Sequence, residues 1–289
     1  MAEKARLAVY KVCWNGGHCM ESDILAGLDK AVEDGVDVIS IALGSGRSEP
    51  DFLDPIAIGS FGAMEKGVFV SAAAGNSSFR AETVDNVAPW MITVGASTID
   101  RKFPADVIVV CDRADIGCVD KGNAVKKAGG IELVKKVLNY VNSTKNPRAT
   151  MVFHKTQLGA KPAPVVPVFS SGGPNPQSIY IVKPDVIAPG VDILAAWTND
   201  SSPSGCLEDT RRAEFNIISG TSMSCPHVSG LAALLKAAHL DWSPAMIKSA
   251  LMTTAYTQDE DGNPLLDEKD LNQTNIWAMG LDMWILRKL

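Results

Sequence analysis

The sequence predicts an α/β fold in which helices cover a mostly parallel β-sheet. Through the first hundred residues, short apolar runs alternate with longer amphipathic runs, which is the pattern of strands joined by helical crossovers. The apolar runs are nearly continuous, as expected of parallel strands that are buried on both faces. With 289 residues, of which 46% are hydrophobic, the chain is long enough to bury a substantial core.

Four strands and two helices are predicted in this first part of the chain. The strands are expected at residues 6–12, 36–43, 68–74 and 91–96, and the helices at residues 22–33 and 54–66. Gly35 and Gly67 directly follow the two helical patterns, where a glycine commonly ends a helix. Each helix therefore connects two strands as a right-handed crossover.

The second part of the chain begins with a change of composition. From about residue 103 the sequence turns to a strand-like VIVVC run and Lys-rich helical patterns, which predict a separate small insert. Proline and glycine dominate residues 161–189, as in extended chain that returns to the main sheet. Two helices follow, one beginning near Thr221 and one at Pro244 after the N-cap Ser243. The tail after Thr257 is irregular, and no element is predicted there.

Composition excludes several classes of function. The net charge of -6 comes from 27 basic and 33 acidic residues mixed along the chain, so neither a nucleic-acid nor a membrane partner is predicted. No apolar run approaches the roughly 18 to 20 residues that span a bilayer, and the N-terminus lacks the pattern of a signal peptide. The cysteines form no CxxC pair and carboxylates do not cluster at calcium-loop spacing. We therefore predict no metal and no cofactor, while disulfide pairing among the six cysteines stays open.

The strongest chemical signal is the string GTSMSCPHVSG at residues 220–230. A serine at the start of a helix has its hydroxyl at the positive end of the helix dipole, beside free backbone N–H groups. Gly220 permits a tight entry to the helix, and Pro226 is tolerated because it lies in the first turn. Taken alone, however, Gly-Thr-Ser before a helix is more often an ordinary N-cap than a nucleophile.

The whole string resembles the serine motif of the subtilase family, in which GTSM is followed by a small pair and then PHVSG or PHVAG. The resemblance implies that Ser222 is the nucleophile of a serine endopeptidase. The string differs from the GxSxG elbow of α/β-hydrolases, because Ser224 stands at the fifth position. No GxGxxG or Walker string supports a nucleotide-binding protein.

Two strand ends resemble further parts of the subtilase site. Asn76, in the string Ala73-Ala74-Gly75-Asn76, is implied to donate a hydrogen bond to the tetrahedral oxyanion, although without the resemblance a turn asparagine would be the better explanation. Ala42-Leu43-Gly44 matches the segment that lines the P1 pocket and pairs with the substrate backbone in this family, and Ala74 and Gly75 are also expected to bind substrate. Gly44 would let a peptide or protein substrate approach in extended conformation as an added strand, but a strand that ends in a glycine turn accounts for the same residues.

Other strings at residues 4–14, 169–176 and 183–197 are similar to the plant branch of this family. The resemblance implies a subtilisin-like three-layer α/β/α fold, incomplete in this chain. It divides the sequence into an N-terminal part of the catalytic domain (1–102), a remnant of a protease-associated domain (103–160), the C-terminal part with the serine motif (161–267) and a divergent tail (268–289). The family is usually extracellular, so the apoplast is the expected compartment.

The family also requires a His as general base and an Asp that orients it, and neither of their motifs occurs in this chain. The four histidines, His18, His154, His227 and His239, are not expected to serve as the base. We therefore expect a truncated product that starts at an internal Met, with an exposed edge on its sheet. Two functions remain: a serine endopeptidase by family, or an inactive fragment that acts at most as a peptide- or protein-binding module.

Overall fold

The computed structural model describes residues 2–14, 18–44, 46, 48–78, 80–106, 152–153, 155–204, 209–280 and 282–283. The chain forms two compact units, one of residues 1–100 with 161–289 and one of residues 101–160. In the second unit, β4 (Ala105–Asp106) pairs with β5 (Val152–Phe153) in antiparallel register. The predicted VIVVC strand and Lys-rich helices lie outside the described residues, so the protease-associated origin of this insert stays a prediction.

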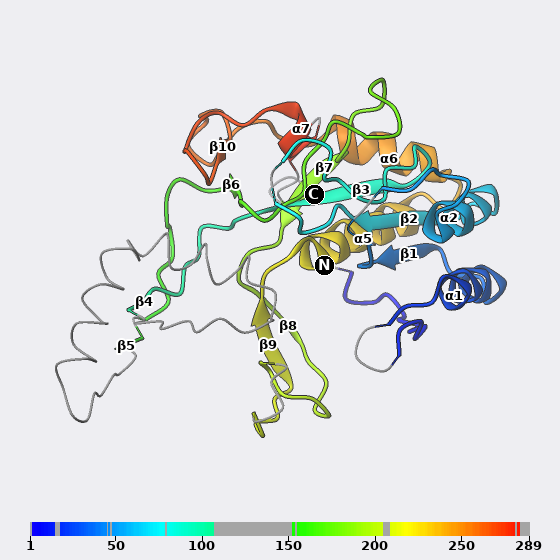
Figure 1. Cartoon of the computed structure of the whole chain (residues 1–289), viewed down its shortest axis with the longest axis horizontal. Helices are drawn as coiled ribbons and strands as arrows, with labels where there is room; N and C mark the ends of the chain where they lie inside the picture. Colours follow the sequence, from blue (N-terminus) through cyan, green and yellow to red (C-terminus); the bar gives the residue numbers. More distant parts are fainter. Residues whose placement is uncertain are drawn as a thin grey trace. The chain divides into compact units, whose positions relative to one another are not determined.

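The first unit is built on a five-stranded parallel sheet (Figure 1). The strands stand in the order β1-β2-β3-β7-β11, with bounds β1 (Val38–Ile41), β2 (Phe69–Ala73), β3 (Ile92–Ser97), β7 (Val186–Pro189) and β11 (Asp282–Met283). The register pairs Val38 with Phe69, Ser71 with Ile92, and Val94 with Val186. The predicted α/β class with a mostly parallel sheet is confirmed.

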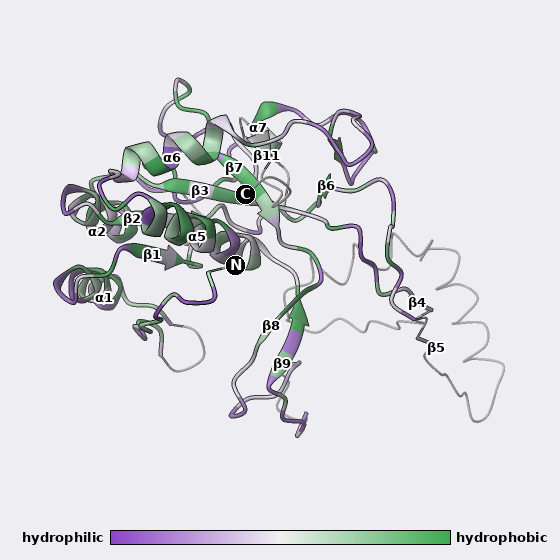
Figure 2. Ribbon diagram, turned by 180° about the vertical axis from the view of Figure 1, so that it is seen from behind, coloured by the Kyte–Doolittle hydropathy of each residue, from purple (hydrophilic) through white to green (hydrophobic). Residues whose placement is uncertain are grey.

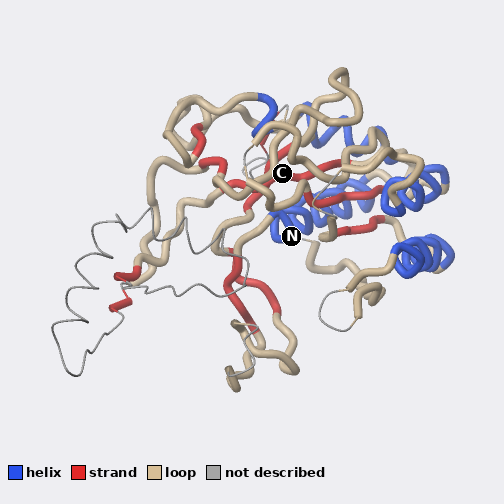
Figure 3. The backbone as a smooth tube through the Cα atoms, viewed as in Figure 1, coloured by secondary structure: helices blue, strands red, loops and turns tan. Residues whose placement is uncertain are grey.

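Helices cover both faces of this sheet, which gives three layers (Figure 3). One face carries α1 (Glu21–Glu33) and α2 (Pro55–Glu65); the other carries α5 (Thr221–Ala238) and α6 (Pro244–Thr253). In β2, Phe69 and Ala73 pack into the core under α5 and α6, whereas Val70 and Ala72 pack under α1 and α2. Burial on both faces explains the continuous apolar sequence of the inner strands, which Figure 2 shows in green for β3 and β7.

The helix ends follow the signals read from the sequence. Asp54 caps α2 by accepting the Ile56 N–H at 2.8 Å, and Ser243 caps α6 by accepting the Met246 N–H at 3.3 Å. Gly35 follows α1 with φ of 77°, the left-handed conformation that glycine adopts without strain. Both ends of α1 and α2 and the starts of α5 and α6 therefore lie within two residues of the predicted positions.

The predicted strand at residues 6–12 is wrong. Within the described part of the chain, residues 6–13 make no backbone hydrogen bond, and Leu7 and Val9 are each 91% exposed. A strand exists only where a neighbour receives its backbone bonds, and β1 pairs with β2 alone. The apolar alternation of RLAVYKV is real, but no partner strand lies beside it.

The tail is also more ordered than its sequence indicated. β10 (Leu266–Asp267) pairs with β6 (Val165–Val166), α7 (Ile276–Met279) follows, and β11 joins the central sheet beside β7. Two-residue ladders leave no periodicity in a sequence, which is why the irregular pattern concealed them. A further unpredicted element is the antiparallel hairpin of β8 (Ile193–Ala196) and β9 (Phe215–Ile218), which projects from the sheet region (Figure 3).

Candidate active site

Ser222 is the second residue of α5 and is half-buried. The entry to the helix is fixed by the Gly220 N–H, which donates to the carbonyl oxygen of Gly190 at 2.8 Å. The Ser222 hydroxyl donates a long hydrogen bond of 3.4 Å to the Ala42 carbonyl oxygen at the end of β1. The backbone N–H of Ser222 has no acceptor among the described residues. The Ser222 hydroxyl and an unused backbone donor therefore share the positive end of an 18-residue helix.

Asn76 lies beside this helix start, held by its side-chain oxygen. Its Oδ1 accepts the Thr221 N–H at 2.9 Å and the Thr221 hydroxyl at 3.1 Å, and the same hydroxyl accepts the Gly75 N–H at 3.2 Å. Because the N–H of Thr221 can only donate, the amide oxygen must face it. The Asn76 Nδ2 is thereby turned to the Gly220 side, where it donates to no described residue. Asn76 Nδ2 and the Ser222 N–H are two preorganised donors.

The predicted substrate residues lie at the carboxyl ends of β1 and β2. Ala42 and Gly44 are exposed and Leu43 is half-buried. Ala74 is fully buried, and both of its backbone groups are used, by Val94 and Asp85. Ala74 can therefore support the Gly75-Asn76 turn but has no free group to offer a peptide.

Asn86 joins the two strand ends and was missed from the sequence. Its Nδ2 donates to the carbonyl oxygens of Leu43 at 2.8 Å and Ala73 at 2.7 Å. The residue is buried and has a φ of 55°, a conformation that asparagine tolerates better than most residues. The signal that could have identified it is the polar pair Asp85-Asn86 within the apolar run of residues 84–91.

No hydrogen bond joins a described histidine to Ser222. The His227 Nδ1 lies 2.7 Å from the Met223 carbonyl oxygen, His239 stacks on Trp242, and the backbone of His18 pairs with that of Trp14. His154 lies outside the described residues. Within the described chain, the Ala42 carbonyl oxygen is therefore the only acceptor of a hydrogen bond from the Ser222 hydroxyl. A backbone carbonyl cannot act as a general base.

Comparison with known proteins decides the family. The family model described as Subtilase family matches residues 1–275. This chain belongs to the subtilase family. Subtilisin-like protease SBT1.5 of Arabidopsis thaliana is 46% identical over 371 residues, which cover 97% of this chain and 48% of that protein. Subtilisin-like protease SBT1.6 of the same plant is 44% identical and is covered to 46%. The chain spans about half the length of the curated relatives that it matches.

Solved structures show the same fold. The structure described as Sphericase superposes with a TM-score of 0.57 at 23% identity, with 96% of this chain and 67% of that chain covered. The S41 Psychrophilic Protease gives a TM-score of 0.55 at 20% identity. At these identities the likeness concerns the fold, and it confirms the subtilisin-like architecture that the sequence predicted.

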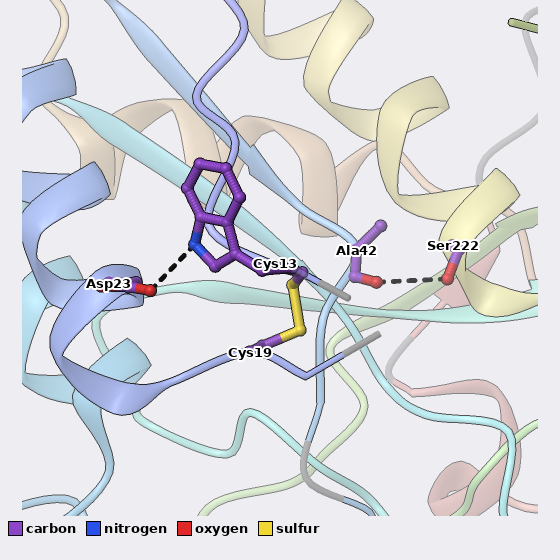
Figure 4. Close-up of a disulfide and its surroundings, with 6 residues drawn as sticks. Cys13, Cys19, Asp23, Ala42 and Ser222 are labelled. Carbon is purple, nitrogen blue, oxygen red and sulfur yellow. Dashed lines mark hydrogen bonds between the residues drawn. A yellow bond between two sulfur atoms is a disulfide. The ribbon is translucent and has the colours of Figure 1, made fainter. Parts of the chain in front are cut away.

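A disulfide between Cys13 and Cys19 lies near the serine of this subtilase chain (Figure 4). It closes a short loop that begins at Trp14, whose Nε1 donates to Asp23 in the first turn of α1 at 2.9 Å. Cys225 is free and buried. The sequence had left the pairing open, and Cys111, Cys118 and Cys206 lie outside the described residues.

No group of side chains in the described ranges could hold a metal ion. Likewise, no helix of the described chain has both the length and the apolar character needed to cross a membrane.

Asp85 is a buried carboxyl group beside Gly44 and Gly75, and burial raises its pKa. It is 3% exposed; its Oδ2 accepts the Gly46 N–H at 2.9 Å, while Oδ1 has no partner among the described residues. The Gly46 N–H lowers the pKa and the charge of Asp54 raises it further, but burial is the largest influence. The ionised carboxylate therefore costs stability at neutral pH.

Replacing Asp85 with Asn should stabilise the chain by about 1–2 kcal/mol at pH 7, because the amide still accepts the Gly46 N–H without a buried charge. The pKa of Asp85 in the folded state lies above the unfolded value of 3.8. Between these two pKa values the native state binds more protons than the unfolded state, so the wild type loses stability as the pH rises from one to the other. The gain should therefore vanish near pH 3. Urea unfolding at both pH values measures it, with Asp200→Asn, an exposed aspartate, as the control. An equal gain at both pH values would show that the charge of Asp85 is not responsible.

Proposed function

We propose that this chain carries the serine-bearing part of a serine-type endopeptidase site. Ser222 attacks the scissile peptide carbonyl, and the resulting oxyanion receives hydrogen bonds from the Ser222 N–H and the Asn76 Nδ2. The observation that supports this proposal best is the pair of unused donors beside one hydroxyl at a helix N-terminus. Donors held in place before the reaction stabilise the charge that develops in the transition state.

The reaction proceeds through two displacements. The Ser222 Oγ forms a bond to the peptide carbonyl carbon, the C–N bond then breaks, and the amine leaves with a proton. Water hydrolyses the acyl-enzyme in the second displacement and restores the serine. Both steps need a general base: in the first it takes the Ser222 proton and passes it to the leaving amine, and in the second it takes a proton from water and passes it to the Ser222 oxygen. Since no described histidine contacts Ser222, we propose that the base comes from polypeptide outside the described residues, and that residues 1–289 alone turn over slowly or not at all.

The substrate of the site is a peptide or protein segment in extended conformation. Ala42 and Gly44 are exposed beyond the end of β1, only 3.4 Å separates the Ala42 carbonyl oxygen from the Ser222 hydroxyl, and Gly75 lies at the end of β2. A peptide that pairs with residues 42–44 as an added strand would bring its carbonyl groups past Ser222. An extracellular compartment suits this function, because the Cys13–Cys19 disulfide persists under oxidising conditions.

A chimera tests the proposed role of Ser222. In SBT1.5 of Arabidopsis thaliana, the segment that matches this chain is replaced by residues 1–289, and cleavage of a quenched fluorogenic peptide is measured. We expect the chimera to cleave the peptide, Ser222→Ala to abolish cleavage, and Ser229→Ala, a serine on the same helix, to retain it. A folded chimera whose activity survives Ser222→Ala would contradict the proposed nucleophile. A folded chimera with no activity would instead favour a peptide-binding module.

A further inference from the structure

The side chain of Asp85 lies between the carboxyl ends of β1 and β2. A Cβ atom added to Gly44, beyond the end of β1, would come within 2.6 Å of the Asp85 Oδ2. A Cβ atom added to Gly75, beyond the end of β2, would come within 3.2 Å of the same oxygen. The carboxylate therefore occupies the space that these two glycines leave open, and a substrate side chain directed between the two strand ends would approach it.

The segment that carries Asp85 is fixed to both strand ends. The Asp85 N–H donates to the Ala74 carbonyl oxygen at 2.9 Å, and the Asn86 Nδ2 donates to the Leu43 carbonyl oxygen at 2.8 Å. The valines on both sides of this Asp-Asn pair are buried in one apolar cluster with Ala74. The carboxylate is thus held in place before a substrate arrives, as a group that determines specificity must be.

One oxygen of this carboxylate has no hydrogen-bond partner. The Oδ2 accepts the Gly46 N–H at 2.9 Å, whereas the buried Oδ1 has no partner among the described residues. The neighbouring charge of Asp54 is also negative, so these surroundings favour a cation at this place. A buried, unpaired carboxylate oxygen costs stability, and the predicted gain in Asp85→Asn is the recovery of that cost. A group that destabilises the fold inside a substrate site is a candidate for a functional role.

The substrate residue that faces Asp85 is the one immediately before the cleaved bond. That residue carries the carbonyl group that Ser222 attacks, and its oxygen must point to Asn76. Its backbone runs beside residues 42–44 in the proposed strand pairing. Its side chain is thereby directed between Gly44 and Gly75, where the resemblance to subtilases places the P1 pocket.

We propose that Asp85 selects substrates with a basic residue, Lys or Arg, immediately before the cleaved bond. The ammonium or guanidinium group of that side chain donates to the free Oδ1 and balances the buried negative charge. This inference rests on the proposed function, because it assigns a substrate class to the same site.

The same carboxylate disfavours other substrates. An apolar side chain at this position would leave the Asp85 Oδ1 without a donor and further removed from water, and sites with an unpaired polar group discriminate strongly against such substrates. An acidic side chain would add a negative charge beside Asp85 and Asp54. The selection is therefore for positive charge, and not only for size.

Peptide binding to the folded chain of residues 1–289 tests this selection without depending on catalysis. Two fluorescein-labelled peptide amides are compared by fluorescence anisotropy, each with four alanines followed by arginine or by norleucine. We expect the arginine peptide to bind about tenfold or more tightly than the norleucine peptide, and Asp85→Asn to bind both equally. Asp200→Asn, an exposed aspartate, should keep the preference. Because Asp85→Asn is expected to stabilise the fold, unfolding cannot explain its loss of preference.

The active chimera gives the second measurement, as the ratio of kcat/KM for fluorogenic peptides with arginine or norleucine before the cleaved bond. We expect a ratio of about ten or more that falls to about one in Asp85→Asn. Equal cleavage of both peptides overturns the proposal, as does a preference for arginine that survives in Asp85→Asn.

An inactive chimera leaves the decision to the binding ratio of the isolated chain. A preference for the arginine peptide that is lost in Asp85→Asn would then support the role of Asp85 while contradicting the proposed function. Equal or absent binding of the two peptides would contradict both. Cleavage without preference, in turn, contradicts only the role of Asp85, so the two failures are distinguishable.

Discussion

Replacing Asp185 with Ala should lower the free energy of unfolding by about 3–5 kcal/mol, because it leaves two lysines without their counter-charge. The Lys183 Nζ is fully buried and lies 2.7 Å from Asp185 Oδ2, and the Lys248 Nζ lies 2.9 Å from Oδ1. Burial lowers the pKa of Lys183 to about 8, and the Asp185 charge opposes this. Burial works to raise the pKa of Asp185, but the two lysine charges hold it below its ordinary value.

Lys183→Met is the matched control, because it removes one buried charge and leaves Asp185 paired with Lys248 and with the Thr93 N–H. We expect a smaller cost than for Asp185→Ala, about 1–3 kcal/mol, because Asp185 keeps Lys248 as its counter-charge while the Met91 carbonyl and the Thr93 hydroxyl lose the Lys183 donor. Urea unfolding followed by circular dichroism measures both variants. Similar losses for the two variants would mean that Asp185 does not act as the shared counter-charge. β7 begins directly after Asp185 and ends at Pro189, next to Gly190, whose carbonyl oxygen accepts the Gly220 N–H at the start of α5. Loss of the Asp185 ion pairs should therefore also disturb the start of α5.

Replacing Asn76 with Ala in the active chimera should reduce kcat by about 10²–10³, the effect reported for the oxyanion asparagine of subtilisin, another member of the family. KM should change little, because the hydrogen bond forms mainly in the transition state. Peptide cleavage by variants of equal stability measures the effect.

Asn76→Asp separates the catalytic role from the structural one. The carboxylate can still accept the Thr221 N–H, as Asn76 Oδ1 does at 2.9 Å, but it has no N–H to offer an oxyanion. The loss of kcat should be at least as large as in Asn76→Ala. Asn272→Ala, an exposed asparagine of the same unit, should behave as wild type. Normal kcat in Asn76→Asp would limit Asn76 to holding Thr221.

The sequence predicted the parts of the fold in which local signals and burial agree. β2 and β3 are apolar because both faces are covered, and α2 and α6 begin at an Asp and a Ser that cap them. Ser222 and Asn76 could be singled out because the strings around them resemble subtilase motifs; by position alone an N-cap serine and a turn asparagine would explain them. That the two lie at one helix start is a tertiary fact, visible only through the Thr221 contacts.

Other features depend on partners distant in sequence, and these were missed. RLAVYKV, residues 6–12, has the apolar alternation of a strand, but no described strand lies beside it to accept its backbone hydrogen bonds. β11 has no clear apolar alternation, yet it pairs with β7. The Lys183-Asp185-Lys248 cluster could not be distinguished from surface charge, because its members become buried only when β3, β7 and α6 meet. In each case the decisive contact joins segments that are far apart along the chain.

The most direct test of the serine site is the mapping of a fluorophosphonate adduct by mass spectrometry, in the chimera and in folded residues 1–289. The account predicts one adduct on Ser222 in the chimera, none in its Ser222→Ala variant, and none in the isolated chain, where no histidine of the described residues contacts the hydroxyl. The loss of the base histidine alone costs subtilisin about 10⁶ in kcat, so the contrast should be large. An adduct on another residue, or full labelling of Ser222 in the isolated chain, would contradict the account.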